Sequence, residues 1–284
     1  LIRAVRATRP HVLISFMTVS VLAACWLLRI PYIYADHLDV RRLATSLKWK
    51  ILCNFLLRRA YRVVVLSERD RKFIAWYHGA WKPAVIYNPA LPAEKGFFPR
   101  PDFFEPGKKY AIAVGRLVKQ KGFDLLLEAW RRICEDFPDW RLCIIGAGEE
   151  ESELKGLADT LDVQYCVQFV PPVQGLNAVY RHAELYAMSS RTEGFPMVLL
   201  EAMAFGLPVV SFNCNGPDAI VRDGVDGFLV KPGYTDRLAA KMADLMRDEE
   251  KRRAFGQKAT EVTQRFSLQK YLDAYEQLCK EAIK

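Results

Sequence analysis

The sequence lacks the residue patterns that build metal centres and disulfide frameworks. Its seven cysteines are scattered along 284 residues without a Cys-x-x-Cys pair or a regular spacing. Most lie in apolar runs, where a free cysteine behaves as a small hydrophobic residue, so the pattern argues against a zinc site and favours a reducing compartment. No Asp-x-Asp metal motif occurs either, and we expect no metal ion and no other cofactor.

Signals for secretion and for crossing a membrane are also scarce. The sequence shows no charged and then apolar leader with a small-residue cleavage site. It begins at Leu1 without a methionine, so we expect a fragment of a longer protein. The apolar segment Val12–Leu28 has only 17 residues and includes Ser15 and Thr18, whereas a membrane-spanning helix usually needs about 20. A buried strand and helix are therefore preferred there, and a transmembrane helix is the alternative.

Acidic residues are few in the first part of the chain. Residues 1–100 contain 17 Lys and Arg but 5 Asp and Glu, whereas residues 101–284 contain 24 and 28. This asymmetry predicts that the first part faces an anionic partner. Because no zinc-finger, helix-turn-helix or RNA-binding signature occurs, we expect no nucleic acid and prefer an anionic membrane surface or a phosphate-bearing lipid.

A predicted helix near 40–60 concentrates this charge. Basic and large apolar residues are interleaved on it, which suits a helix lying against an anionic bilayer. The alternative is that the apolar side chains pack inward and the cations form a solvated face. The basic members are Arg41, Arg42, Lys48, Lys50, Arg58 and Arg59, and the apolar ones are Trp49, Ile51, Phe55 and Leu56.

Strand and helix signals alternate along the chain, which predicts an α/β protein with parallel sheets. Strands are expected at 11–16, 31–36, 62–67 and 84–88, and then at 110–115, 141–146, 165–170, 184–189, 208–212 and 228–231. Helices are expected at 18–29, 40–60, 68–79 and 124–137, among others. The expected divisions are a partial N-terminal domain at 1–92, a proline-rich linker at 93–107, a doubly wound domain at 108–264 and a C-terminal helix at 265–284.

Two carboxylates, Glu193 and Glu201, flank a Gly-Phe-Pro turn that is expected to open a helix from Pro196 to about Phe205. Proline fits the first turn of a helix because its missing N–H has no partner there. The free N–H groups at such a start, together with the helix dipole, suit a diphosphate. The alternative is a capped surface helix with two solvated glutamates.

Two segments resemble glycosyltransferase family 4, the retaining enzymes of the GT-B fold, and in particular those of bacterial cell-envelope polysaccharide synthesis. Ser189–Val221 resembles the family's donor-sugar site, and Val114–Gly122 (VGRLVKQKG) resembles its phosphate-binding segment. The resemblance is firm over 108–265 and looser over 1–92. It implies two Rossmann-like domains facing a cleft, with the acceptor on the first and the nucleotide sugar on the second. Four strand signals are few for the first domain, so we expect it to be truncated at its N-terminus.

The resemblance also assigns roles to individual residues. Arg116 and Lys121 would hold the donor phosphates, Glu201 would accept hydrogen bonds from the ribose, and the base would lie near Val170. The catalytic set implied is Glu193, His37, Arg116 and Lys121, with His37 close to the transferred sugar or the acceptor. The donor-binding set is Gly115, Arg116, Lys121, Gly146, Val170, Ser190, Glu193, Gly194, Phe195, Pro196 and Glu201. Several of these follow expected strand ends directly, which is where parallel sheets bind ligands.

The function implied is retaining transfer of a hexose or N-acetylhexosamine from a nucleotide donor, preferably UDP-linked, to a lipid-linked or polysaccharide acceptor. The location implied is cytoplasmic, peripheral on the inner face of the cytoplasmic membrane. A sugar-nucleotide epimerase of the same fold and a non-catalytic nucleotide-sugar-binding subunit are the alternatives. An NAD enzyme is a weaker one, because the Gly146-x-Gly148 turn lacks the third glycine of the dinucleotide fingerprint.

Overall fold

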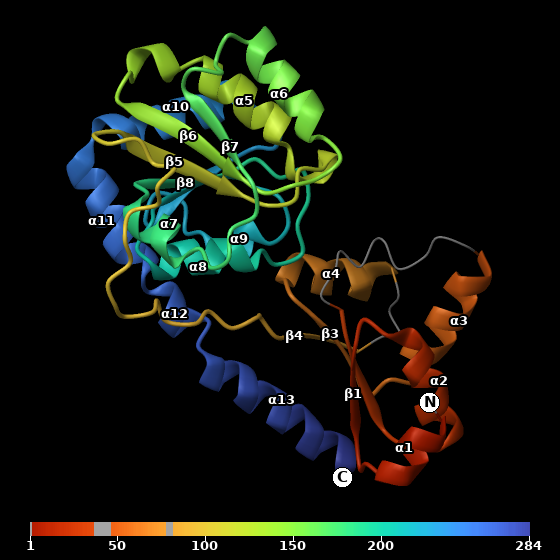
Figure 1. The fold of residues 1–284 in the computed structure, drawn as a ribbon. Coiled ribbons are helices and arrows are strands. Elements are labelled where there is room, and N and C mark those ends of the chain that lie inside the picture. Colours follow the sequence, from red (N-terminus) through yellow and green to blue (C-terminus); the bar gives the residue numbers. More distant parts are fainter. Residues whose placement is uncertain (1, 37–46, 78–81) are drawn as a thin grey trace. The chain divides into compact units, whose positions relative to one another are not determined.

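A computed structural model describes residues 2–36, 47–77 and 82–284, with side chains described throughout except at 47–50 and 77. The chain divides into two compact units (Figure 1). The first comprises Leu1–Pro89, Glu193–Phe195 and Phe266–Lys284, and the second comprises Ala90–Thr192 and Pro196–Arg265.

The first unit is built on a parallel sheet in which the strands follow one another in chain order, β1-β2-β3-β4. The four strands expected in this part of the chain are confirmed as β1 (Leu13–Phe16), β2 (Tyr32–Ala35), β3 (Arg62–Val65) and β4 (Pro83–Val85). The helices are α1 (Ile2–Thr8), α2 (Val19–Leu27), α3 (Leu47–Leu57), α4 (Glu68–Tyr77) and α13 (Leu268–Ile283).

Both faces of this sheet are covered, which explains why its strands read as uninterrupted apolar runs. Side chains alternate between the faces of a strand. Tyr32 and Tyr34 of β2 accordingly belong to a core formed with α2 and α3, whereas Ile33 and Ala35 belong to a core with Tyr275 of α13.

The apolar segment at 12–28 is divided between β1 and α2, so the alternative of a transmembrane helix there is wrong. The left-handed residue Met17, with φ at 58°, turns the chain between the two elements. Across the part of the chain that the structure describes, no helix has the length and apolar character to cross a membrane.

The second unit contains six parallel strands in the order β10-β9-β8-β5-β6-β7. The six expected strands are confirmed as β5 (Lys109–Val114), β6 (Trp140–Ile145), β7 (Val167–Val170), β8 (Leu185–Met188), β9 (Val209–Phe212) and β10 (Gly227–Val230). The helices are α5 (Phe123–Arg131), α6 (Glu151–Thr160), α7 (Asn177–His182), α8 (Met197–Ala204), α9 (Pro217–Ile220), α10 (Thr235–Arg247), α11 (Glu249–Ala259) and α12 (Val262–Arg265), with short 3-10 helices η2 (Lys119–Lys121) and η3 (Cys134–Asp136).

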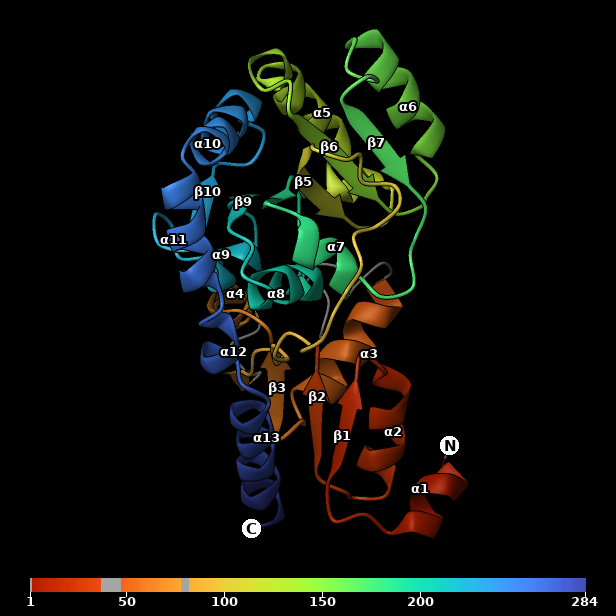
Figure 2. The same ribbon diagram turned by 60° about the vertical axis from the view of Figure 1, so that its left-hand side comes forward.

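Helices cover both faces of the second sheet. Helices α5, α6 and α10 lie on one face, where Trp130 and Leu238 are fully buried, and α7, α8 and α9 lie on the other (Figures 1 and 2). The expected helix at 124–137 is interrupted, because α5 ends at Arg131 and the chain continues as η3.

The strand order fixes where this unit can bind a ligand. The chain runs from β5 outward to β6 and β7, and then returns to the other side of β5 for β8, β9 and β10. The order therefore reverses between β5 and β8. In open parallel sheets a crevice forms at such a point, outside the carboxyl ends of the strands.

Candidate active site

Three loops meet closely at the carboxyl ends of β5, β6 and β8, and glycines permit the contact. A Cβ atom on Gly146 would lie 1.9 Å from the carbonyl oxygen of Gly115. A Cβ on Gly122, whose φ is +65°, would lie 2.2 Å from the carbonyl oxygen of Ser189. No side chain fits at such distances, so these positions require glycine. Gly115 and Gly146 of the expected donor-binding set thus adjoin one another.

A cavity of about 250 Å³ opens between the loops that follow β5, β6 and β7. Its walls are mostly apolar or main chain, including Gly115, Gly146, Pro172 and Val173, with Arg116 also lining it. Val170 itself ends β7, where its carbonyl accepts a hydrogen bond from the N–H of Gly146 (2.9 Å). The part of the site that was expected near Val170 is therefore formed by Pro172 and Val173.

A second cavity, of about 390 Å³, shares Val173 and Leu176 with the first and contains Glu201. The phenol of Tyr180, which is buried, donates a hydrogen bond to Oε2 of Glu201 over 3.1 Å. Burial, followed by the charges of Tyr186 and Glu201, raises the pKa of Tyr180 far above its usual value. Tyr180 therefore remains a neutral donor that orients the Glu201 carboxylate.

Tyr180 was not predicted as a site residue, because nothing local in the sequence links it to a glutamate 21 positions later. The segment 93–107, which was expected to be a proline-rich linker, belongs to the second unit. Glu94 accepts a hydrogen bond from the Asn177 amide (2.5 Å), and both line the Glu201 cavity. The carbonyl of Phe98 accepts a hydrogen bond from Nε2 of His182 (2.8 Å).

The two expected phosphate ligands follow β5. Arg116 is exposed, and its side chain forms no ion pair within the described part of the chain. The Lys121 side chain lies along Gly115, since a Cβ on that glycine would be 3.4 Å from Cδ and Cε of the lysine. The lack of a side chain at Gly115 therefore leaves Lys121 room to lie along the loop that carries Arg116.

A hydrogen-bonded frame fastens this loop to the one after β8. The Arg191 guanidinium binds both oxygens of Asp124 (2.8 and 2.7 Å) and the carbonyl of Lys119 (2.7 Å). Gln120 exchanges hydrogen bonds with the main chain of Arg191 and Thr192 (2.8 and 2.9 Å). Burial alone would raise the pKa of Asp124, but the hydrogen bonds from Arg191 and Lys119 outweigh it and lower the pKa to about 2.

Ser190 lies in the same fastened loop and is buried. The helix that follows begins one residue later than expected. Pro196 has the extended ψ of 108° and is the residue before α8, which starts at Met197. Pro196 therefore occupies the N-cap position, and no side chain caps the helix there. The first N–H groups of α8 point out of the helix end and have no partner within the helix.

Glu193, Gly194 and Phe195 belong to the first unit. Glu193 is buried, with a relative exposure of 6%. The Phe195 ring lies 5.6 Å from Tyr87 and 5.5 Å from Phe266, so three distant segments of the chain meet in one aromatic cluster. The remaining expected catalytic residue, His37, lies outside the described residues, as do Arg41 and Arg42 of the basic cluster.

Comparison with known proteins bears on this arrangement. Residues 95–262 match the family model of the glycosyl transferases group 1. The amylovoran biosynthesis glycosyltransferase AmsD of Erwinia amylovora is 31% identical over 267 residues, which cover 91% of this chain and 74% of that protein. An uncharacterised glycosyltransferase of Haemophilus influenzae is 35% identical over 215 residues, covering 75% of this chain but 60% of its own length.

Solved structures of glycosyltransferases share the fold. The Anabaena protein Alr3699/HepE, in complex with UDP, superposes with a TM-score of 0.84 at 22% identity, covering 98% of this chain and 80% of that one. Sucrose-phosphate synthase from Thermosynechococcus elongatus gives a TM-score of 0.82 at 21% identity, covering 99% and 76%. These similarities confirm the expected α/β architecture as the GT-B fold. The chain therefore belongs to the group 1 glycosyltransferases, a family of transferase enzymes.

Proposed function

We propose that this chain transfers a hexose or N-acetylhexosamine from a UDP-linked donor, with retention of the anomeric configuration, to a lipid-linked or polysaccharide acceptor. The observation that carries the proposal is the pair of adjoining cavities in the second unit. One has apolar walls beside Arg116, and the other contains the oriented carboxylate of Glu201. A nucleoside diphosphate needs an apolar slot, a cationic rim and an acceptor for its ribose hydroxyls, and these features supply all three.

In this proposal the uracil ring enters the 250 Å³ cavity between the Gly146 turn and Pro172–Val173. The ribose hydroxyls donate to Glu201, and the diphosphate contacts Arg116, Lys121 and the start of α8 after Pro196. The main chain of Ser190 and Gly115 forms the floor. UDP accompanies the Anabaena relative in its solved structure, and UDP-glucose does so in another of its structures, which supports this choice of donor.

The chemistry follows from charge. The bond between the anomeric carbon and the diphosphate oxygen breaks, the acceptor hydroxyl attacks from the same face, and its proton passes to a phosphate oxygen. Arg116 and Lys121 stabilise the negative charge that develops on the leaving diphosphate, which is commonly the largest catalytic contribution in such sites. Glu193, with the main chain of Gly194 and Phe195, is assigned to the donor sugar, and His37 to the sugar or the acceptor.

The acceptor side is proposed on two grounds. The Erwinia relative is named for the synthesis of amylovoran, and the first 100 residues are strongly basic. We assign the enzyme to the inner face of the cytoplasmic membrane, where a lipid-linked acceptor presents its phosphates.

Product analysis tests this function. The protein is incubated with a panel of UDP-sugars and bacterial lipid extract, and the products are separated and their anomeric configuration is read by NMR. The expected result is a new glycoside with the donor's configuration, formed with extract and absent without it, and lost in Lys121→Ala. Conversion of a UDP-sugar without any acceptor would identify an epimerase instead. UDP binding without any product would identify a binding subunit.

A further inference from the structure

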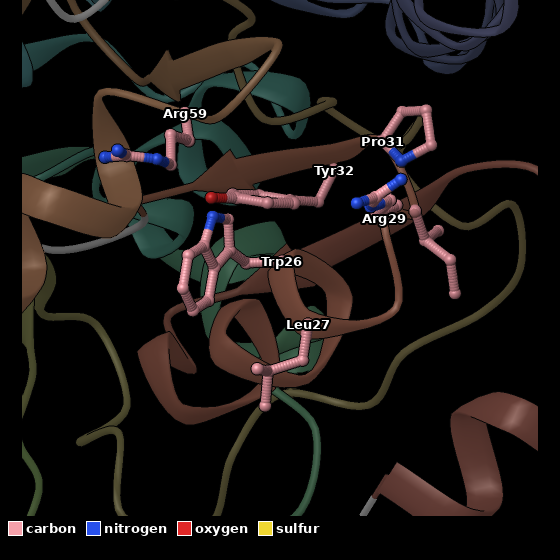
Figure 3. A pocket seen from close by; sticks show the side chains of 7 residues that line it. Trp26, Leu27, Arg29, Pro31, Tyr32 and Arg59 are labelled. Atoms are coloured by element: carbon pink, nitrogen blue, oxygen red, sulfur yellow. The ribbon is translucent and has the colours of Figure 1, made fainter.

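The first unit contains a cavity of about 580 Å³ that the proposed reaction does not use (Figure 3). It is lined by residues at the end of α2, at the start of β2 and just after α3, among them Trp26, Arg29, Tyr32 and Arg59. Tyr32 is the first residue of β2, so the cavity lies at the amino ends of the strands. Ligands of parallel sheets bind at the opposite, carboxyl edge, and this cavity is therefore a separate site.

Two arginines from different elements line the cavity without a carboxylate partner. Neither Arg29 nor Arg59 forms a salt bridge with any residue that the structure describes. The Arg59 guanidinium is nevertheless held in place. It stacks 3.7 Å above the Phe55 ring and donates to the Phe55 carbonyl (3.0 Å), and Phe55 meets Trp26 edge-on at 5.1 Å. A preformed arginine fork of this kind suits a phosphate group.

None of the described residues that line the cavity carries a negative charge to neutralise these arginines. Among the first 67 residues only Asp36 and Asp39 are acidic, and Asp36 is buried at the carboxyl end of β2. Arg3 and Arg6, both exposed, lie on α1, which packs beside α2 (Figure 2). An anionic ligand is therefore the expected occupant.

Large apolar side chains are exposed in the cavity wall and on α3. Trp26 is 43% exposed and Leu27 is 60% exposed, and on α3 Ile51 and Leu52 are 64% and 42% exposed. A free phosphate ion gains nothing from such residues. A lipid surface does, because tryptophan and aliphatic side chains enter the headgroup region while basic residues bind the anionic headgroups.

We propose that this cavity binds the headgroup phosphate of an anionic phospholipid, with Trp26 and Leu27 inserted into the bilayer surface. The proposal deepens the membrane location given under the proposed function and does not depend on the transfer chemistry. It assigns to Arg29 and Arg59 the membrane-anchoring role that was predicted for the basic cluster on the helix near 40–60.

Co-sedimentation with vesicles tests the site. Wild-type protein is expected to bind vesicles of phosphatidylglycerol and phosphatidylcholine and not to bind vesicles of phosphatidylcholine alone. High salt should release it, because the screening length is already about 10 Å at 0.1 M and shortens further as salt is added. Arg29→Ala with Arg59→Ala should weaken partition about 30-fold, since each cation near such a surface contributes about 1 kcal/mol. Arg237→Ala with Arg253→Ala, which removes two exposed arginines of the second unit, is the matched control and should change partition less than about twofold by the same rule.

Two further variants separate a built site from general attraction. Arg29→Lys with Arg59→Lys keeps the charge and loses the planar fork, so partition should fall. Trp26→Ser with Leu27→Ser keeps the charge but removes the side chains that insert into the bilayer, so vesicle partition of this variant should also fall below that of wild type. Equal partition of the lysine pair and wild type would overturn the headgroup site, as would release by inorganic phosphate matched to the lipid phosphate. UDP affinity, measured on every variant, should stay at the wild-type value. If the wild-type protein does not bind UDP, the proposed function is contradicted and the lipid site is unaffected.

Discussion

The Tyr180 phenol donates a hydrogen bond to the Glu201 carboxylate over 3.1 Å and so connects α7 to α8 at the wall of the larger of the two adjoining cavities. Glu201 is exposed and lines the cavity, so the tyrosine holds one carboxylate oxygen and leaves the other free for a ligand. Under the proposed function this residue positions the ribose-binding group without touching the reacting atoms.

Tyr180→Phe should therefore weaken UDP binding about fivefold, because one hydrogen bond contributes roughly 1 kcal/mol. Calorimetric titration with UDP measures the change. Tyr165→Phe, which removes an exposed phenol that contacts Cys134, is the control and should bind like wild type. An unchanged affinity in Tyr180→Phe would show that Glu201 needs no orientation.

Arg116→Ala or Lys121→Ala should lower turnover by about 10²–10³, the scale seen when one group that stabilises transition-state charge is removed. The fold should survive, because Arg116 is exposed and Lys121 is partly so. Steady-state transfer assays measure the effect, with Lys155→Ala, a surface lysine paired to Glu151 on α6, as the control. Transfer at the wild-type rate by Lys121→Ala would remove the phosphate assignment.

Gly146→Ala should destabilise the protein by about 1–3 kcal/mol, the usual cost of forcing an extra methyl group into a packed region. The reason is the 1.9 Å approach to the Gly115 carbonyl. Gly156→Ala is the matched control, since a Cβ there meets nothing within 4 Å. That substitution lies inside α6 and should instead stabilise by roughly 0.5–1 kcal/mol. Thermal unfolding of the two variants should shift in opposite directions, and a neutral Gly146→Ala would contradict the close packing of these loops.

The Asp124–Arg191 pair should contribute stability that depends on acid pH. The pKa of Asp124 is about 2 in the folded chain, below its ordinary 3.8, so the folded state binds this proton less readily than the unfolded state. The contribution is then complete above about pH 4 and is lost as the pH falls toward 2. The difference in unfolding free energy between wild type and Asp124→Asn should shrink over that interval. A difference that stays constant from pH 5 to the acid limit would contradict the pairing.

The sheets were predictable because the described strands are short apolar runs and all of them except β4 are followed by helical segments, the pattern of strands buried on both faces. The positions of glycine-dependent turns were also predictable from the sequence. Gly115 and Gly146 were both expected in the donor-binding set, and these two glycines do bring two loops into contact. Such patterns predict the local structure around each residue, which depends on its neighbours in the sequence.

Contacts between distant segments were not predictable in this way. Arg191 and Asp124 are 67 positions apart, and Tyr180 and Glu201 are 21 apart. The first pairing depends on the strand order, which brings the loops after β5 and β8 together, and no periodicity records that order. The second joins α7 and α8, which precede and follow β8. The basic stretch near α3 shows the same limit. Its charge was evident from the sequence, whereas the second arginine of the cavity, Arg29 in the turn after α2, was not.

The central claim is that the second unit binds uridine diphosphate with its ribose hydroxyls hydrogen-bonded to Glu201, while Glu193 contacts the transferred sugar. Calorimetric titration of wild type, Glu201→Ala and Glu193→Ala with UDP tests it most directly. We predict saturable binding by wild type, a loss of about 1.5–3 kcal/mol in Glu201→Ala, as for hydrogen bonds to a charged group, and nearly unchanged affinity in Glu193→Ala, whose transfer activity alone should fall. Absence of UDP binding by the wild-type chain, or equal losses of affinity in both variants, would contradict the account.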